Sequence, residues 1–260
     1  MKEFRRLIIA FLIGGIVSAS FVVFDEAAQS QTIVYGLGCI PEEINVTGNI
    51  TANLPPPPSW DWREYGIMTS VKNQGQCGSC VAIACNGAFE AIIKWKSGET
   101  VDLSEAHLFF CSGGKCDEGM KISTALNYLR MYGTPDEGCF PYDGAARGSD
   151  LPCSLTCDDW RDRAYRIDGW GVVSGREGIK NALITYGPLV VSYAVYQDFD
   201  DYWFNPGKWS NKVYYHYYGY LRGYHAVVLV GYDDSGQYWN MQKQLGDKWW
   251  HRRLFQNKVR

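Results

Sequence analysis

The sequence lacks any strong excess of charge, with a formal net charge of −3 at pH 7 over 260 residues. A protein without a basic surplus has no general electrostatic attraction for nucleic acid, so we expect no nucleic-acid partner. The chain also lacks a second C-x-x-C pair beside Cys77 and Cys80, which excludes a zinc site built from two such pairs. Only four histidines are present, and no internal repeat is visible. We expect neither a metal ion nor a cofactor.

The chain does have enough apolar and aromatic residues for a folded core. Hydrophobic residues make up 46% and aromatic residues 15% of the sequence, a composition that excludes a disordered chain. At this length the core belongs to one large domain or to two small packed domains.

The N-terminus has the pattern of an export signal. Basic residues near the start precede an uncharged apolar run over residues 7–23, and Val17, Ser18 and Ala19 form a small-residue cleavage site. Residues 1–23 are therefore predicted to be a signal peptide and the protein to be secreted. The alternative is an uncleaved anchor, because the run is at the short limit for spanning a bilayer. Beyond this segment we expect no stable membrane partner.

A proline run divides the chain. Residues 24–58 end in the stiff stretch Pro55 to Pro58 and are predicted to be a short pro-segment or linker, with the folded part starting at Ser59. Helical periodicity dominates residues 59–165, and strand-like runs dominate residues 166–260. This order predicts an α+β fold of two lobes with a cleft between them. Helices are expected over 80–96, from Ser104, over 122–131 and over 177–185; strands are expected over 189–196, 225–232 and 238–239.

Cys80 lies where the first of these helices begins. A redox dithiol with Cys77 would normally follow a strand, but residues 70–75 are polar and loop-like. A purely structural disulfide role stays open for either cysteine. The nucleophile interpretation explains more, because the first turn of a helix lowers a thiol pKa and stabilises the reactive thiolate. Gln74, shortly before Cys80, is a candidate hydrogen-bond donor to the oxyanion that such a nucleophile would form.

A nucleophilic cysteine needs a histidine that takes up and returns a proton. The candidates are His107, His216, His225 and His251. His225 is preferred because it opens the apolar run HAVVLVGY, where a rigid strand would hold the imidazole at one edge.

Tyrosines gather over residues 214–220, just before the predicted strand of His225. Aromatic side chains at this density more often pack into a core than line a binding site. We expect packed aromatic structure here.

Four stretches in chain order carry a family resemblance: WDWREYGIMTSVKNQGQCGSC, LSEAHLFFC, CFPY and YHAVVLVGY. They resemble the papain family of cysteine peptidases, from about Trp60 to Trp239. The resemblance implies a papain-like fold, with a helical N-terminal lobe, an antiparallel β-barrel-like C-terminal lobe and an interlobe cleft. It also implies a hydrolase that cleaves protein or peptide substrates through an acyl-thioester.

Residue by residue, the resemblance makes Cys80 the nucleophile and His225 the general base and acid. It assigns the oxyanion hole to Gln74 and the backbone N–H of Cys80. It makes Gly119 the glycine whose backbone pairs with substrate. Val81 departs from the family, which usually has an aromatic residue there. The long inhibitory pro-region of many relatives is missing, so we do not expect latency through a folded prodomain.

In an exported protein, nine cysteines indicate a disulfide framework rather than metal ligands. Cys80, the helical Cys85 and the linker residue Cys39 are set aside. The remaining six are enough for three bridges: Cys77, Cys111, Cys116, Cys139, Cys153 and Cys157. The resemblance suggests a bridge between Cys77 and Cys116, and the other pairings stay open.

The end of the chain departs most from the family. After Trp239 the family continues with a strand that carries an Asn in a K-N-S-W-G context, and this Asn orients the histidine ring. Here the chain continues NMQKQLGDKWWHRRLFQNKVR, and Lys243 holds the position of the Asn. The simplest interpretation is a divergent, solvated basic tail.

A shift of the reading frame explains this ending more fully. Moving the frame forward by one nucleotide within codon 240 permits Cys-Lys-Asn-Ser-Trp-Gly-Thr, with the Asn at the position of Lys243. We therefore predict a frameshift near codon 240, in the gene or in its reading. As printed, the chain lacks the last strands of the second lobe, and Leu254 and Phe255 have no assigned packing. We expect it to be unstable and weakly active; the alternative function is an impaired relative that binds without cleaving.

Overall fold

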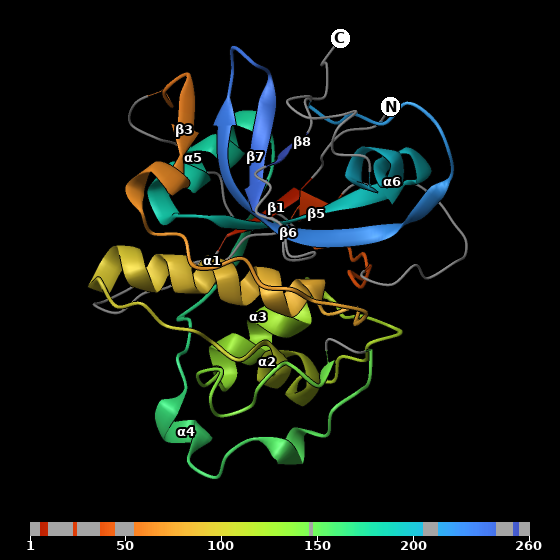
Figure 1. Ribbon diagram of the computed structural model, residues 1–260. Coiled ribbons are helices and arrows are strands. Elements are labelled where there is room, and N and C mark those ends of the chain that lie inside the picture. Colours follow the sequence, from red (N-terminus) through yellow and green to blue (C-terminus); the bar gives the residue numbers. More distant parts are fainter. Residues whose placement is uncertain are drawn as a thin grey trace.

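A computed structural model describes residues 6–9, 23–24, 37–44, 55–145, 148–204, 213–242 and 252–254. The longest helix, α1 (Cys80–Ser97), lies between two parts of the molecule (Figure 1). The other helices of residues 105–163 gather on one side of it, and the larger sheet lies on the other side together with α5 (Arg176–Tyr186) and α6 (Gln197–Phe204). The structure therefore has the α+β arrangement of two lobes that the sequence predicted.

The helical lobe contains α1 (Cys80–Ser97), α2 (Glu105–Cys111) and α3 (Ile122–Met131), as predicted. The Ser104 side chain accepts a hydrogen bond from the N–H of His107, which satisfies an otherwise unpaired donor and fixes the start of α2. At the end of α1, Gly98 has the left-handed φ of 77° that a helix stop favours.

Helix α1 is buried almost all round, because both lobes pack on it. The residues from Cys80 to Ala91 are buried except Gly87, and an added Cβ on Gly87 would lie 3.4 Å from Val228 of the second lobe. A helix that is enclosed in this way belongs to the core rather than to the surface. The first residue of α1 therefore lies at the junction of the lobes.

The second lobe is built on an antiparallel sheet in the order β3-β6-β7-β8, with β5 also paired to β6. Its strands are β3 (Ser59–Asp61), β5 (Leu189–Tyr196), β6 (Leu221–Asp233), β7 (Tyr238–Gln242) and β8 (Arg252–Leu254). The predicted limits of the β5 strand are confirmed. The expectation that nothing follows β7 needs correction, since β8 pairs Leu254 with Trp239.

Strand β6 begins at Leu221, earlier than the predicted start at His225. Its first residues are only partly buried, so the hydrophobic pattern alone does not reveal them, but Tyr224 still pairs with Ala194 of β5. His225 consequently lies inside the strand, opposite Tyr193, rather than at one edge.

A smaller sheet has the order β2-β1-β4, made by β1 (Arg6–Ile9), β2 (Val23–Phe24) and β4 (Gly171–Val173). β1 falls in the region predicted to be a signal peptide, and β2 lies where that region meets the predicted pro-segment. The remaining elements are η1 (Trp62–Tyr65), η3 (Cys153–Leu155), α4 (Trp160–Arg163), α5 (Arg176–Tyr186) and α6 (Gln197–Phe204). Among the described residues, no helix is both long and apolar enough to cross a membrane.

Three disulfides tie the loops of the helical lobe. They join Cys77 to Cys116, the pair that the resemblance suggested, and also Cys111 to Cys153 and Cys139 to Cys157. Cross-links of this kind stabilise a fold mainly by restricting the unfolded chain. The first of them fixes the loop that leads into α1.

Candidate active site

The start of α1 and the middle of β6 meet at the sulfur of Cys80. The backbone N–H of Ala226 donates a hydrogen bond to Cys80 Sγ at 3.5 Å, although 146 positions separate the two residues. Ala226 directly follows His225, so the structure brings the predicted nucleophile and the predicted base to one place. Cys80 is fully buried, and His225 is 1% exposed.

The ring of His225 is enclosed by the second lobe. It lies edge-on to the ring of Tyr193, with 5.8 Å between the centroids. Tyr193 of β5 and Ala226 of β6 are buried as well. Packing on all sides restricts the rotamers of this side chain and so holds the imidazole in a fixed orientation.

The prediction that the helix start lowers the pKa of Cys80 is wrong for this conformation. Burial raises the pKa of the Cys80 thiol to about 11, and backbone hydrogen bonds, from Ala226 first, offset only part of this shift. Transfer of the thiolate out of water costs more free energy than the helix start and the backbone donors provide. The thiol is therefore neutral at pH 7 while the site stays closed.

Gln74 lies in the loop before α1 and is fully buried. Its Nε2 donates to the carbonyl of Cys77 at 2.9 Å. The hydroxyl of Tyr142 donates to the Gln74 carbonyl at 2.9 Å and also contacts the hydroxyl of Ser79. Tyr142 therefore fixes this loop, a role that sequence analysis missed because Tyr142 lies in the second half of the lobe.

Residues 37–44, predicted to be part of a spacer, lie in the cleft beside Cys80. On the helical side, Met120 N–H donates to the Gly38 carbonyl at 2.8 Å, and Ile40 N–H donates to the Met120 carbonyl at 3.0 Å. On the strand side, Cys39 N–H donates to the carbonyl of Tyr224 at 3.3 Å. The segment thus pairs with both walls at once, next to His225.

Glycines allow this segment to approach the cleft walls. An added Cβ on Gly119 would lie 2.0 Å from the Gly38 carbonyl oxygen, and one on Gly38 would lie 1.7 Å from the Gly78 carbonyl oxygen. Gly119 also has a left-handed φ of 79°, which favours glycine. The residue predicted to pair with substrate therefore lies on the cleft wall, directly under residue 38.

A carboxylate anchors the other end of the segment. Glu42 accepts a hydrogen bond from the backbone N–H of Ser123 at 2.7 Å, and the Ser123 hydroxyl donates to its second oxygen. Ser123 lies in the first turn of α3, where unpaired N–H groups favour a negative charge. No sequence pattern predicts this contact, because Glu42 and Ser123 lie far apart in the chain.

Lys72 lies among carboxyl groups, of which those of Glu90 and Glu105 are buried and that of Asp102 is exposed. Lys72 Nζ lies 3.7 Å from Glu105 and also contacts Asp102. Burial raises the pKa of Glu90 to about 7, although its oxygens accept hydrogen bonds from the Thr69 hydroxyl at 2.6 Å and the Leu103 N–H at 2.8 Å. These groups support the helical lobe and do not touch Cys80.

The other histidines do not reach the site among the described residues. His107 is buried in the helical lobe, where its pKa falls to about 4 because of burial. His216 lies beside the Asp198 carboxylate, with Nδ1 and an oxygen 3.1 Å apart. His251 and Lys243 lie outside the described residues, so the third position of the site stays a prediction.

The tyrosine-rich stretch differs from expectation. Tyr214 is buried and donates its hydroxyl to Asp198 at 2.6 Å. The other tyrosines are 48–62% exposed; they are Tyr215, Tyr217, Tyr218 and Tyr220. The prediction of packed aromatic structure is wrong for these four. The Asp198 carboxylate accepts hydrogen bonds from the N–H groups of Tyr217 and Tyr218, which holds this part of the stretch at the surface rather than in the core.

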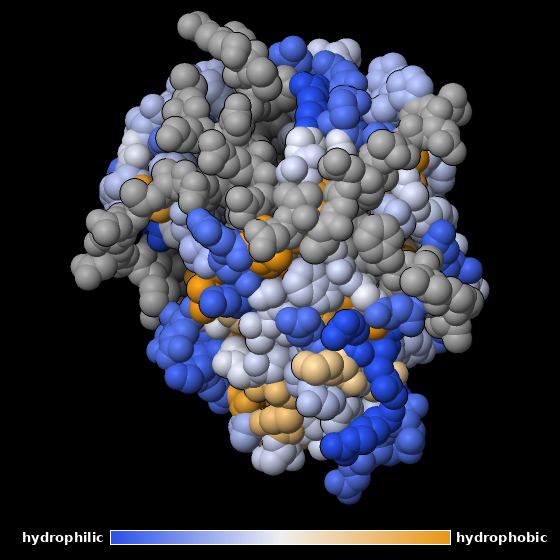
Figure 2. All heavy atoms as spheres, turned by 180° about the vertical axis from the view of Figure 1, so that it is seen from behind, coloured by the Kyte–Doolittle hydropathy of each residue, from blue (hydrophilic) through white to orange (hydrophobic). Residues whose placement is uncertain are grey.

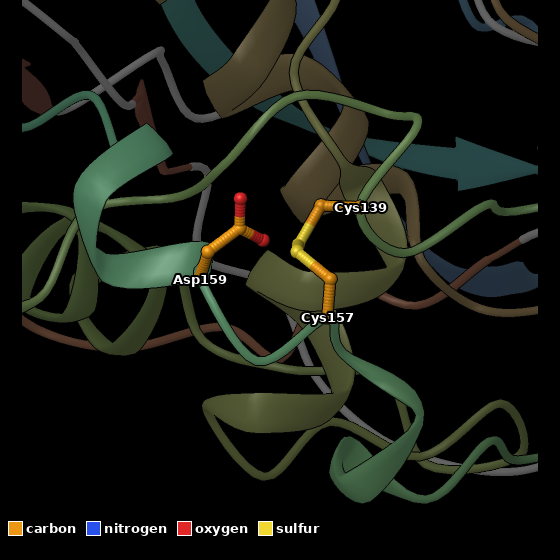
Figure 3. A group of neighbouring side chains, drawn as sticks. All are labelled: Cys139, Cys157 and Asp159. Carbon is orange, nitrogen blue, oxygen red and sulfur yellow. A yellow bond between two sulfur atoms is a disulfide. The ribbon is translucent and has the colours of Figure 1, made fainter.

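One group of metal-ligand types occurs among the described residues: Cys139, Cys157 and Asp159, with ligand atoms within 4.8 Å of one another. Both sulfurs belong to one disulfide (Figure 3), which removes the thiolates that a metal would need. Asp159 is also paired with Arg163 at 3.6 Å. The residues do not fit a metal centre.

Figure 2 shows the face of the molecule that is turned away in Figure 1, with the helical lobe in its lower half. Hydrophilic residues dominate its lower half, and apolar residues form separate small areas among them (Figure 2). Scattered apolar residues of this kind are normal on a protein surface and indicate no binding site.

Comparison with known proteins gives the same assignment. A sequence profile described as "Papain family cysteine protease" matches residues 56–257. The chain is 32% identical over 207 residues to a Giardia intestinalis protein named "Cathepsin B-like CP1", covering 75% of this chain and 66% of that protein. It is 30% identical over 217 residues to cathepsin S of Bos taurus, covering 78% of this chain and 60% of that protein.

Solved structures share the fold. A procathepsin B of Trypanosoma congolense superposes with a TM-score of 0.63 and 21% identity, over 86% of this chain and 78% of that chain. A cysteine protease of Carica candamarcensis, solved in complex with E-64, gives a TM-score of 0.60 and 25% identity, over 78% of this chain and 91% of that chain. The chain spans less than two thirds of the length of the first curated relatives that it matches.

Proposed function

The chain belongs to the papain family of cysteine proteases, and we propose that it is a secreted peptidase that hydrolyses peptide bonds through Cys80 and His225. One observation carries the proposal: the N–H next to His225 donates to the sulfur of Cys80, so nucleophile and base share one buried site at the lobe junction. The substrates are proteins or peptides bound along the cleft wall of Gly119 and Met120.

The reaction begins with proton transfer from the Cys80 thiol to the imidazole of His225. The thiolate attacks the carbonyl carbon of the scissile bond, and the carbonyl oxygen takes the negative charge. His225 then gives its proton to the leaving amine, which produces an acyl-thioester on Cys80. Water, deprotonated by the same imidazole, hydrolyses this thioester and restores the thiol.

Donors near the start of α1 stabilise the oxyanion. The backbone N–H of Cys80 is one, and the Nε2 of Gln74 is the other once it turns from the carbonyl of Cys77. Such preorganised donors contribute most where water is excluded, as around these buried residues.

Catalysis requires residues 37–44 to leave the cleft. They pair with the backbone of Met120 and shield Cys80, so substrate and segment compete for one wall. Their departure also exposes the thiol to solvent, which lowers its pKa towards the range in which His225 can deprotonate it.

The altered C-terminus limits the activity of the printed chain. We infer a shifted reading frame near codon 240, which replaces the histidine-orienting Asn by Lys243. Loss of the orienting group costs about 10⁴ in rate in a comparable serine-protease triad. If the printed frame is the one that is translated, an impaired relative that binds peptides in the same cleft is the second candidate.

Labelling by an epoxide inhibitor of the E-64 type tests the proposed chemistry. After reduction and proteolytic release of residues 37–44, the protein should be alkylated at Cys80 much faster than glutathione. His225→Ala should abolish this advantage because the imidazole no longer generates the thiolate. Cys85→Ala is a matched control, since Cys85 is also a buried, unbridged cysteine of α1. Alkylation of Cys80 at the rate of a model thiol would contradict the proposal.

A further inference from the structure

Three cysteines are not part of disulfides, and all three are buried: Cys39, Cys80 and Cys85. Cys80 and Cys85 belong to α1, whereas Cys39 belongs to the segment laid in the cleft. Nothing in the proposed peptidase chemistry requires a thiol at residue 39. Its position against the nucleophile therefore calls for a separate explanation.

The backbone carries Cys39 to the start of α1. The Gly38 backbone packs directly on that of Gly78, since an added Cβ on Gly38 would lie 1.7 Å from the Gly78 carbonyl oxygen. Cys39 is the residue after Gly38, and Cys80 lies two residues after Gly78. Hydrogen bonds to Tyr224 and Met120 keep residues 38–40 in this register.

The surroundings of the two thiols also coincide. The Cys39 thiol is hydrogen-bonded to the Ser192 side chain, and its pKa is raised, first by burial and then by Cys80. Ser192 is the β5 partner of Ala226 in β6, and Ala226 N–H donates to Cys80 Sγ. Both sulfurs therefore lie against the same pair of strand residues.

We propose that Cys39 and Cys80 form a reversible disulfide that locks residues 37–44 in the cleft and keeps the nucleophile inactive until a thiol reduces it. The inference rests on the proposed role of Cys80 as nucleophile. The bridge adds a covalent bond to the backbone pairing with Met120 and Tyr224. The segment thereby gains a lock controlled by the redox state of its surroundings.

The chemistry balances with a small disulfide, such as cystine or oxidised glutathione, as the oxidant. The Cys80 thiolate attacks one sulfur of the small disulfide, forming a mixed disulfide and releasing one small thiol. The Cys39 thiolate then attacks the Cys80 sulfur, forming the protein disulfide and releasing the second small thiol. Two protein thiols are oxidised and one small disulfide is reduced to two thiols; excess thiol drives both steps backwards.

The segment itself favours the second step. Once residues 38–40 pair with the cleft walls, Cys39 meets Cys80 within one molecule rather than from solution. The mixed disulfide should therefore accumulate in wild type far less than in a variant without the Cys39 thiol. The three existing disulfides leave both thiols free for this exchange.

Mass spectrometry of the full chain tests the proposal. The protein is treated with oxidised glutathione, quenched in acid, alkylated and digested at low pH to prevent exchange. Wild type and Cys85→Ala should yield a peptide that joins Cys39 to Cys80. Cys39→Ser and Cys39→Ala should instead carry glutathione on Cys80, with roughly tenfold or more adduct than wild type. Glutathione on Cys80 of wild type without the cross-link, or a link from Cys39 to Cys85, would overturn the lock.

Epoxide labelling of the fully reduced protein, after proteolytic release of residues 37–44, separates this proposal from the proposed function. A cross-linked peptide together with slow labelling after reduction would leave the disulfide standing and count against the peptidase. Rapid labelling after reduction with no cross-link would support the peptidase and count against the disulfide. Both cysteine variants at position 39 should label at least as fast as reduced wild type, because neither removes a catalytic group.

Discussion

The two lobes hold their parts of the site by different means. The helical lobe contains six of the nine cysteines as three disulfides, and the sequence has no cysteine after Cys157. The second lobe depends on strand pairing, such as that of β5 with β6, which holds His225 opposite Tyr193. The nucleophile thus lies on a covalently tied scaffold and the base on a sheet, so damage to the sheet should affect the base first.

Restoring the C-terminal segment should have the largest effect. A gene whose frame is shifted at codon 240, so that it encodes Cys-Lys-Asn-Ser-Trp-Gly, should raise kcat/KM for a peptide substrate by up to about 10⁴, because an Asn again orients His225. The gain is measured with fluorogenic peptides after the segment 37–44 has been released by reduction and proteolysis.

Lys243→Asn in the printed frame is the matched control for that experiment. It supplies the amide but not the restored flanking sequence, so we expect little recovery. Ordinary peptidase rates from the printed chain would contradict the frame hypothesis and show that the second lobe needs no orienting Asn.

Breaking one covalent tie of the helical lobe should have the next largest effect. The double variant Cys77→Ser and Cys116→Ser should lower the free energy of unfolding by about 2–4 kcal/mol, because the unfolded chain regains the freedom of a long loop. Urea denaturation monitored by tryptophan fluorescence measures the change. The cross-linked residues are 39 positions apart.

Cys139→Ser with Cys157→Ser gives the matched comparison, because these residues are only 18 positions apart. Because its loop is shorter, loss of this disulfide should lower the free energy of unfolding by about 0.7 kcal/mol less than loss of the first one. Equal losses from both pairs, or a loss confined to the shorter loop, would show that native packing rather than chain freedom decides the stability of this lobe.

The sequence could predict what local signals determine, but not what long-range packing determines. The limits of α1, α3 and β5 follow from local signals, such as the Gly98 stop and the run of strand residues from Leu189. The helix start predicted Cys80 as the nucleophile and the strand run predicted His225 as the base, and the family resemblance supported both. The contact of the Ala226 N–H with Cys80 Sγ is made through packing that no local pattern shows.

The cleft segment was not predictable in this way. Residues 37–44 have no strong helical or strand period, and their place depends on hydrogen bonds to Met120 and Tyr224 and on the Glu42 contact with Ser123. The raised pKa of Cys80 follows from that enclosure rather than from its position at a helix start, which explains why the local argument gave the wrong sign.

The smallest effect concerns pH and sharpens the picture of the helical lobe. Burial raises the pKa of Glu90 from 4.5 to about 7, so the folded state binds a proton that the unfolded state has already lost in this range. The stability contributed by protonated Glu90 is full below about pH 4.5 and is lost as pH rises through 7. Glu90→Gln keeps the group neutral, so it should reduce the fall in unfolding free energy between pH 5 and pH 7.5 by about 1–3 kcal/mol.

Urea denaturation at the two pH values measures this change, with Glu118→Gln as the control. Glu118 makes only an exposed ion pair with Lys115, and its removal should leave the pH dependence within about 0.5 kcal/mol of wild type. Glu105, whose pKa burial also raises, keeps part of the slope in Glu90→Gln. An unchanged slope in Glu90→Gln would mean that Lys72 keeps Glu90 ionised in the folded state, and that the helical lobe tolerates a buried ion pair where we expect a neutral acid.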